Sequence, residues 1–389
     1  MAISRPIVLI PNVAEPSKWA VIACDQFTGQ PEYWEQLTEH IGDAPSALNF
    51  VLPEVWLGDK LIEAPAEIAA AMQTSLANGH FDELAGFILV ERTLSSGVKR
   101  LGLIAAIDLN EYEYTENSQA KIRATEKTVE ERLPARVTVR ENAPLETPHT
   151  ILFINDPDQG VIERLYANKA EYQMVYDFEL NMGGGHLRGW LIPDDRVTAE
   201  LLALEKDGLL AVVGDGNHSV AAAKLAGDLQ TLVEIVNIHS EAIEFEPIHR
   251  VILGAGYPLI DALSAHLSKS VEPGQAEVAE TKVYHQGSTV YLPIPPNPAD
   301  AVADIQDFLD QYAANQPEIE IDYIHGADHL IAIADRENGV AVFLPALAKA
   351  GLFDFVAKKG VLPRKAFSVG APQDKRYYFE AAARLQPRA

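Results

Sequence analysis

The pattern of hydrophobic and polar positions changes several times along this chain, and each change predicts a different element. Residues 86–92 and 99–108 alternate on either side of a Ser-Ser-Gly turn at 95–97, which predicts a β-hairpin. Helices are predicted for residues 32–40, 65–78, 119–132 and 198–207, and strands for residues 19–24, 150–155, 171–180 and 187–192. Hairpins are mixed with helices, so we expect an α+β fold with a mixed sheet and flanking helices rather than a doubly wound parallel sheet.

The pattern becomes a more regular alternation of helices and strands after about residue 240. Helices are predicted for residues 258–268, 299–314 and 326–334, and strands for residues 282–293, 318–324 and 340–344. The prolines at 293–298 predict a loop inside a domain rather than a linker. We therefore predict an α+β core over residues 1–240 and a smaller α/β domain or layer over residues 241–389.

The sharpest change of pattern lies at residues 209–226. An apolar run typical of a buried strand ends at Gly214-Asp215-Gly216, and alanine-rich residues 220–226 predict a helix capped by Asn217 or Ser219. The free amides of a helix's first turn attract anions, and glycine lets a ligand approach the backbone. Asp215 and His218 add a metal ligand or base beside a titratable donor. The alternative is a purely structural turn, because Asp-Gly and Asn are common turn formers.

Two further segments are candidates for the same chemistry. In the predicted helix 119–132, Arg123, Glu126 and Glu130 recur at intervals of three and four residues, which is typical of salt bridges on a solvated face. The functional alternative makes Glu126 a general base and Arg123 a phosphate ligand. Gly183, Gly184 and Gly185 form either a loose hairpin turn or a backbone nest around an oxyanion. Three glycines cost conformational entropy, which favours the nest.

Composition and charge exclude several classes of protein. With 48% hydrophobic and 22% charged residues, the 389-residue chain has the composition of a soluble globular protein. Its one cysteine, Cys24, permits no intrachain disulfide and no cysteine-rich zinc site, which fits a cytoplasmic protein. The first apolar run stops at Pro11, too short for a signal peptide or a membrane span. A formal net charge of −25 argues against binding nucleic acid or DNA.

A basic segment interrupts this acidic composition near the end of the sequence. Six cations lie between Lys358 and Arg376. They are typical of a solvated surface that balances nearby acids. Alternatively, Arg364 or Lys365 folds back and closes a pocket over a phosphate, since an anionic ligand needs only a few convergent donors.

Several long blocks of the sequence resemble a bacterial and archaeal family, domain of unknown function 1015 (DUF1015), nearly end to end. The blocks are 20–34 (AVIACDQFTGQPEYW), 122–137 (IRATEKTVEERLPARV), 181–192 (NMGGGHLRGWLI), 214–219 (GDGNHS), 245–251 (FEPIHRV) and 362–370 (LPRKAFSVG). The family name implies no reaction. The GDGNHS segment is similar to the DGHHR-type turn of the ParB/sulfiredoxin-like superfamily, which includes free-serine kinases that phosphorylate serine with a nucleotide.

The second resemblance implies a set of binding residues. It implies that the nucleotide phosphates are bound by Asp215, Gly216, Asn217, His218 and Ser219. This sequence departs from the motif twice, because Asn217 stands where those proteins have a first histidine and Ser219 stands where they have an arginine. A phosphate-binding cation must then come from elsewhere, with Arg123, Arg188, Lys224 and Arg250 as candidates.

The resemblances also imply candidates for the catalytic base. Many family members have a His-Glu pair where this chain has Thr125-Glu126, so the carboxylate is retained and the imidazole is not. The serine kinases use a catalytic glutamate early in the chain, and Asp25 is the nearest candidate here.

Together these features predict a phosphoryl-transfer enzyme for a small hydroxy amino acid or its phosphate, with serine or phosphoserine favoured. The expected cofactors are ATP or ADP and Mg²⁺, with Asp215 as the metal ligand. Asp25 or Glu126 would take the hydroxyl proton, and His218 would assist. A phosphatase is a close variant. The alternatives are a non-catalytic sensor of a nucleotide or phosphorylated metabolite and, third, a DNA-binding or nuclease role; a homo-oligomer is left open.

Overall fold

The computed structural model describes residues 1–270, 279–314 and 316–386. The chain forms two compact units. Unit 1 comprises Met1–Ile243, Val356–Gly360 and the residues from Gly370 on, and unit 2 comprises Glu244–Phe355 and Val361–Val369. The polypeptide therefore passes between the units four times. The sequence prediction had a single boundary near residue 240.

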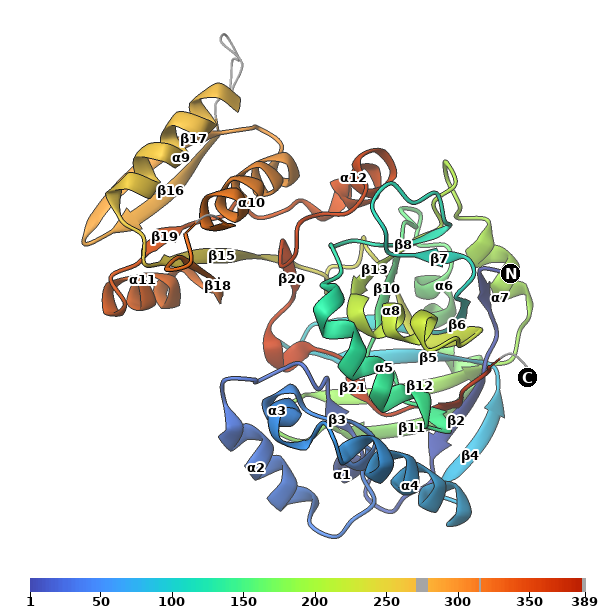
Figure 1. Cartoon of the computed structure of the whole chain (residues 1–389). Helices are drawn as coiled ribbons and strands as arrows, with labels where there is room; N and C mark the ends of the chain where they lie inside the picture. Colours follow the sequence, from blue (N-terminus) through green and yellow to red (C-terminus); the bar gives the residue numbers. More distant parts are fainter. Residues whose placement is uncertain (271–278, 315, 387–389) are drawn as a thin grey trace. The chain divides into compact units, whose positions relative to one another are not determined.

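Unit 1 is built on a mixed sheet of ten strands (Figure 1). The strands are β1 (Ile3–Ser4), β5 (Phe87–Thr93), β6 (Lys99–Asp108), β7 (Tyr112–Glu113), β8 (Ile122–Ala124), β10 (Ile151–Ile154), β11 (Gln173–Glu179), β12 (His186–Ile192), β13 (Ala211–Asp215) and β14 (Gln230–Asn237). Their order is β11-β12-β5-β6-β14-β10-β13-β8-β7, and β1 pairs with β6. Pairing is antiparallel from β11 to β14, whereas β14 with β10, β13 with β8 and β8 with β7 are parallel. The prediction of an α+β fold with a mixed sheet and hairpins is confirmed.

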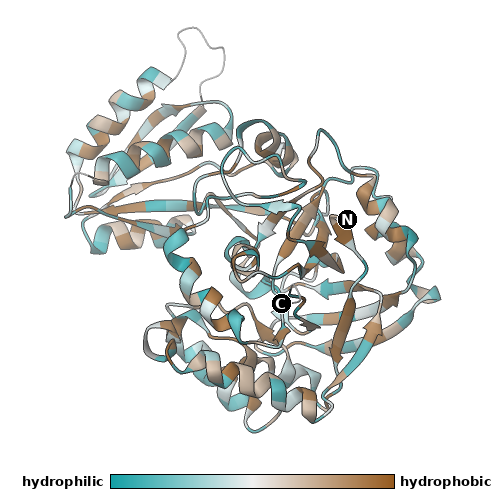
Figure 2. Cartoon of the chain, turned by 45° about the vertical axis from the view of Figure 1, so that its right-hand side comes forward, coloured by the Kyte–Doolittle hydropathy of each residue, from teal (hydrophilic) through white to brown (hydrophobic). Residues whose placement is uncertain are grey.

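The helices of unit 1 accompany this sheet, and the unit has two apolar cores. The helices are α1 (Pro16–Trp19), α2 (Pro31–Ile41), α3 (Leu57–Lys60), α4 (Ala64–Ala77), α5 (Leu133–Glu141), α6 (Ile162–Ala167), α7 (Arg196–Leu202) and α8 (Asn217–Leu225). Trp19, Trp34 and Phe50 are buried in one core, and Phe87, Leu103 and Leu152 in another. Figure 2 shows the strands as mainly hydrophobic and the helices as mixed, as expected for helices that bury one face.

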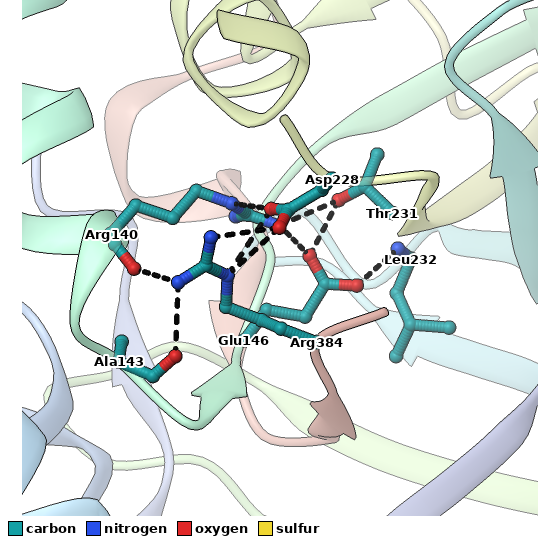
Figure 3. Close-up of polar contacts among 7 residues, drawn as sticks. All are labelled: Arg140, Ala143, Glu146, Asp228, Thr231, Leu232 and Arg384. Atoms are coloured by element: carbon teal, nitrogen blue, oxygen red, sulfur yellow. Dashed lines mark hydrogen bonds and ion pairs between the residues drawn. The ribbon is translucent and has the colours of Figure 1, made fainter. Parts of the chain in front are cut away.

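Short pairs of strands tie the late residues of the chain into unit 1. The pairs are β3 (Val21–Ile22) with β21 (Tyr377–Tyr378) and β9 (Leu145–Glu146) with β22 (Ala382–Ala383). A further short pair joins two early strands, β2 (Ile7–Pro11) and β4 (Phe81–Ala85). After β22, the Arg384 guanidinium donates to the fully buried Asp228 at 2.7 Å, and the same carboxylate accepts from Arg140 (Figure 3). Unit 1 is therefore completed by residues that follow unit 2 in the sequence.

In its described residues, unit 2 contains a sheet of six strands and three helices of its own. The strands are β15 (Phe245–Leu253), β16 (Ala279–His285), β17 (Ser288–Ile294), β18 (Glu320–His325), β19 (Val340–Val342) and β20 (Phe367–Val369). The sheet order is β17-β16-β19-β15-β18, and β20 pairs with β15. The helices are α9 (Tyr257–Ser270), α10 (Pro298–Ala314) and α11 (Ala327–Arg336), and α12 (Leu352–Lys359) includes the second passage between the units. None of the helices in the described part of the chain has the length and apolar character needed to cross a membrane.

Two predicted elements differ from the structure. The predicted helix 119–132 is wrong, because β8 occupies Ile122–Ala124 and the helix begins only at Leu133. Pairing with β13 buries this stretch, and Pro134 fits the first turn of a helix. The predicted strand 282–293 is a hairpin of β16 and β17, joined by Gln286 and Gly287 at φ of 48° and 76°.

Candidate functional site

The turn after β13 has the predicted order of strand, turn and helix. β13 ends at Asp215, and α8 begins at Asn217. Gly216 lies between them in the left-handed conformation, with φ 83°, and a Cβ added there would lie 2.8 Å from Oγ1 of Thr150. Only glycine fits this position without strain. The predicted capping by Asn217 or Ser219 is wrong: Gly216 is the N-cap residue, and no side chain caps the helix.

The segment after β8 crosses this turn. The Thr125 amide donates to Oδ1 of Asn217 at 3.3 Å, and the Val129 amide donates to Nε2 of His218 at 3.1 Å. Glu126 lies between these two anchors in the sequence and is half-buried, and its role at the turn stays a prediction. Because Nε2 of His218 accepts a backbone hydrogen bond, it carries no proton in this arrangement. A hydrogen bond from His218 to a phosphate would therefore come from Nδ1.

Asp215, the predicted metal ligand, already has partners for both carboxylate oxygens. Oδ2 accepts from Nζ of Lys375 at 3.1 Å, and Oδ1 accepts from the Gly216 amide at 3.0 Å. Among the residues that the structure describes, no group of three or more His, Cys, Asp or Glu side chains is arranged to hold a metal ion. The residues present do not fit a Mg²⁺ site made by protein alone, and a Mg²⁺ ion held mainly by substrate phosphates would need Asp215 to exchange its lysine partner.

The three glycines form a tight turn between β11 and β12. The Gly184 carbonyl accepts from Nε of Arg92 at 2.9 Å, and a Cβ on Gly185 would lie 2.0 Å from the Thr93 carbonyl oxygen. Nη1 of Arg92 also donates to the Lys375 carbonyl at 3.3 Å. Since Nζ of Lys375 contacts Asp215, the glycine turn and the GDGNHS turn are linked through Arg92 and Lys375. Phosphate binding by Gly183 and its neighbours stays a prediction.

Two of the predicted phosphate ligands have structural contacts elsewhere. Arg123 is 4% exposed, and its Nε donates to the Ala120 carbonyl at 2.7 Å, at the end of the sheet where β13 begins. Burial lowers the pKa of Arg123. Arg250 lies in unit 2, is fully buried, and donates to Gln306 at 2.6 Å and to the carbonyls of Ile248 and Lys365 at 2.7 and 3.0 Å. These bonds hold unit 2 together, and a phosphate contact by either arginine stays a prediction.

A cavity of about 140 Å³, the unit 1 cavity, lies beside α8. α5 packs against α8 (Figure 1). Residues of α5, among them Arg136 and Val139, line the cavity. Its apolar lining includes Phe50, Leu52, Ile68, Met72 and Val139, and its polar lining includes Cys24, Glu54, Arg136, His149, Thr150, Ser219 and Tyr378. Ser219 in the first turn of α8 thus connects the GDGNHS segment to the cavity. An apolar wall facing a few convergent polar groups is typical of small-molecule sites.

Three of the polar lining residues contact one another. The Tyr378 hydroxyl lies 3.0 Å from Sγ of Cys24 and 2.8 Å from Nδ1 of His149. Burial, and then the charge of Asp25, raise the pKa of Cys24 to about 12. The Cys24 thiol is therefore protonated at neutral pH. Although Cys24 and His149 lie close together, Cys24 is not a thiolate nucleophile. The sequence analysis did not find His149 or Tyr378, since neither lies in a pattern that distinguishes it from a core residue.

Acidic and basic groups converge next to Cys24. Asp25 follows it directly and accepts from Nε2 of Gln26 at 2.9 Å. The Glu54 amide donates to the Cys24 carbonyl at 2.8 Å, and the Glu54 carboxylate forms an ion pair with Arg136. Asp25 and Glu54 raise the pKa of the Cys24 thiol and Arg136 lowers it, so all three charges lie close to this thiol. Asp25, predicted as a base, is thus adjacent to the unit 1 cavity.

The cations of the predicted basic segment lie in both units. Lys375 and Arg376 are buried in unit 1, where Arg376 pairs with Glu234 at 2.8 Å and Glu380 at 2.6 Å. Burial would raise the pKa of Glu234, but Arg100 and Arg376 lower it. In unit 2, Arg364 pairs with Asp310 at 3.0 Å. Closure of a pocket by Arg364 or Lys365 stays a prediction.

Comparisons with known proteins found a family model and several solved structures that match the chain. The model of the family described as protein of unknown function (DUF1015) matches residues 9–312. No curated protein matches the sequence. Three solved structures resemble the chain with TM-scores of 0.43, 0.39 and 0.40 and identities of 13%, 13% and 11%: a mutant free serine kinase in complex with AMP, a conserved hypothetical protein from Pyrococcus furiosus, and C-terminally truncated SbnI from Staphylococcus aureus. The matches cover 70%, 68% and 69% of this chain and 92%, 94% and 82% of those proteins. At these values the likeness assigns neither a reaction nor a ligand to this chain.

Proposed function

Since this chain belongs to the DUF1015 family, whose description names no reaction, we propose a function from the geometry of unit 1. The protein is a phosphoryl-transfer enzyme that acts on a small hydroxy amino acid or its phosphate, with serine or phosphoserine favoured and ATP or ADP as the partner substrate. The phosphates bind at the turn of Gly216 to Ser219, and the amino acid binds in the unit 1 cavity.

One observation carries this proposal: Ser219 of the turn and Cys24, the neighbour of Asp25, line the same cavity. The first turn of α8 therefore borders the same cavity as Cys24, whose sequence neighbour Asp25 is a carboxylate. Phosphoryl transfer needs this combination, because its transition state is stabilised mainly by positioning and by charge neutralisation around the phosphoryl group. Half-buried Glu126, held against the turn by its neighbours, is the second candidate base.

In the proposed reaction Asp25 accepts the proton of the substrate hydroxyl. The hydroxyl oxygen forms a bond to the terminal phosphorus of the nucleotide, and the bond between that phosphorus and its bridging oxygen breaks. The products are the amino acid phosphate and the shortened nucleotide. The amides of Asn217 and His218 and Nδ1–H of His218 donate hydrogen bonds to the phosphate oxygens, whereas the Ser219 amide donates to the Gly216 carbonyl at 2.9 Å. A phosphatase would instead use water as the nucleophile and the amino acid phosphate as the donor, and it would release the amino acid and inorganic phosphate.

The test is incubation of the purified protein with L-serine and ATP or ADP, with phosphoserine measured by mass spectrometry, followed by the reverse assay from phosphoserine. Replacing a general base lowers such rates about 10²–10⁴-fold, so we expect Asp25→Asn to do so. The matched control is Asp158→Asn, an exposed aspartate of unit 1, which should retain full activity. Equal activity in both variants would rule out Asp25 as the base.

The same assay, together with a measurement of ATP and ADP binding, distinguishes an enzyme from a non-catalytic sensor. A protein that only reports on a nucleotide or phosphorylated metabolite would bind ATP or ADP but form no phosphoserine. Binding without turnover, in both directions, would replace the proposed enzyme with that alternative.

A further inference from the structure

We propose that the Glu54–Arg136 ion pair at the unit 1 cavity is the recognition site for the α-carboxylate and α-ammonium groups of a free amino acid. The inference rests on the proposed function, because it names the class of acceptor for the same cavity: a zwitterionic α-amino acid rather than a hydroxy acid, an amino alcohol or a peptide.

Two arginines with carboxylate partners line the cavity, and the burial of those carboxylates distinguishes them. Arg140, itself 17% exposed, pairs with Glu146 and Asp228, whose side chains are 4% and 0% exposed, and it also contacts Thr231 (Figure 3). Breaking such a pair leaves a buried charge without compensation. In the Glu54–Arg136 pair each side chain is 21% exposed. A partly solvated pair contributes little to stability, so its members can exchange partners at low cost.

The backbone fixes both partners of the accessible pair. Arg136 lies in the first turns of α5, and its Nη1 donates to the Arg132 carbonyl at 2.9 Å. Glu54 is held by its amide, which donates to the Cys24 carbonyl at 2.8 Å. A guanidinium and a carboxylate are thus presented side by side on separate elements. Arginine binds carboxylates in a bidentate geometry, and a carboxylate accepts hydrogen bonds from an ammonium group.

A zwitterion carries the complementary pair of charges on adjacent atoms. Its α-carboxylate would bind Arg136 and its α-ammonium would bind Glu54, so the existing pair opens and two new pairs form with no change in net charge. The attachment of Glu54 to Cys24 then directs the substrate side chain toward Asp25. A hydroxyl on that side chain would meet the proposed base beside the apolar lining at Phe50 and Leu52.

The experiment is isothermal titration calorimetry of the full chain with L-serine, L-threonine, L-homoserine and L-alanine, and with two analogues of serine. L-serine methyl ester lacks the carboxylate, and N-acetyl-L-serine lacks the ammonium group. We expect at least one free amino acid to bind, both analogues to bind at least tenfold more weakly than serine, and Arg136→Gln and Glu54→Gln each to weaken serine binding about tenfold or more.

The pairing of analogues with variants excludes a merely structural role. The ester should bind Arg136→Gln as well as it binds the wild type, and N-acetylserine should bind Glu54→Gln as well as it binds the wild type, because each variant removes the partner of the group that is already missing. Arg136→Lys should recover part of the affinity. Lys121→Gln and Glu205→Gln, from a pair in unit 1 that is 43% and 30% exposed, serve as charge-matched controls and should change nothing.

Two outcomes overturn the inference: none of the four amino acids binds, or both variants weaken the ester and N-acetylserine as much as they weaken serine. ATP and ADP binding, measured in the same variants, should be unchanged. If amino acids bind in the expected pattern and no phosphoserine forms, the recognition site stands and the proposed reaction fails. If phosphoserine forms with an unchanged KM for serine in both variants, the reaction stands and the recognition site fails.

Discussion

Gly216 occupies a position in which both the backbone conformation and the neighbouring side chain require glycine. We predict that Gly216→Ala lowers the free energy of unfolding by about 2–4 kcal/mol, because strain at positive φ adds to the contact with Thr150. Gly208→Ala is the matched control: its φ is 75° and no atom lies within 4 Å of an added Cβ, so the loss should be about 1 kcal/mol. Urea denaturation of both variants measures the difference, and equal losses would contradict the steric part of the argument.

A histidine in unit 2 predicts a dependence of stability on pH. His249 is 7% exposed, and its Nδ1 accepts from the Leu344 amide at 3.1 Å. Burial, then the charges of Arg250 and His325, lower its pKa from 6.5 to about 4. Since the unfolded chain binds the proton more tightly, this contribution to stability is complete above pH 6.5 and is lost as the pH falls toward 4.

We expect the wild type to lose roughly 1–3 kcal/mol more stability than His249→Asn between pH 7.5 and pH 4.5. Asparagine keeps an acceptor near the position of Nδ1 but does not titrate. Urea denaturation at the two pH values provides the comparison. Parallel losses in the two proteins would show that the imidazole is not the group that titrates.

Among the elements, the short strand β22 and its flanking arginine depend on one carboxylate. Asp228 is fully buried and accepts from Arg384 at 2.7 Å and from Arg140 at 2.5 Å. Asp228→Asn removes the charge that compensates both guanidinium groups, and we predict a loss of about 3–5 kcal/mol. The control is Asp195→Asn, whose side chain is 77% exposed and pairs with Arg5, where the loss should stay below about 0.5 kcal/mol. Thermal and urea denaturation measure the loss of stability in both variants. A loss in Asp228→Asn as small as that in Asp195→Asn would mean that water solvates the network.

Elements with a clear local pattern could be predicted from the sequence, and elements defined by distant partners could not. The hairpin of β5 and β6 and the turn at Gly216 follow from alternation and from glycine placement. β8 could not be predicted, because its strand conformation depends on pairing with β13, which lies far along the chain. The same holds for the site. Asp215 and Ser219 belong to a motif, whereas His149 and Tyr378 are brought together over a separation of 229 residues.

At the scale of the whole molecule, unit 1 depends on residues that follow unit 2. A fragment of residues 1–243 lacks β21, β22, Arg376 and Arg384, and it leaves Glu234 and Asp228 buried without these partners. We predict that this fragment shows no cooperative unfolding transition, and that a peptide of residues 370–386 added in trans increases its protection from hydrogen exchange. A fragment that unfolds at the same urea concentration as the full chain would disprove this dependence.

The return of the chain to unit 1 also sets the order of events during synthesis. Segments generally fold as they leave the ribosome, the N-terminal ones first. Tyr378 and Lys375, which reach the cavity and the GDGNHS turn, are made after every residue of unit 2. The first 243 residues therefore lack these contacts while the following 126 residues are translated. A chain whose translation stops before residue 370 would contain the whole GDGNHS motif but would lack Lys375 and Tyr378, so it should not assemble the proposed site.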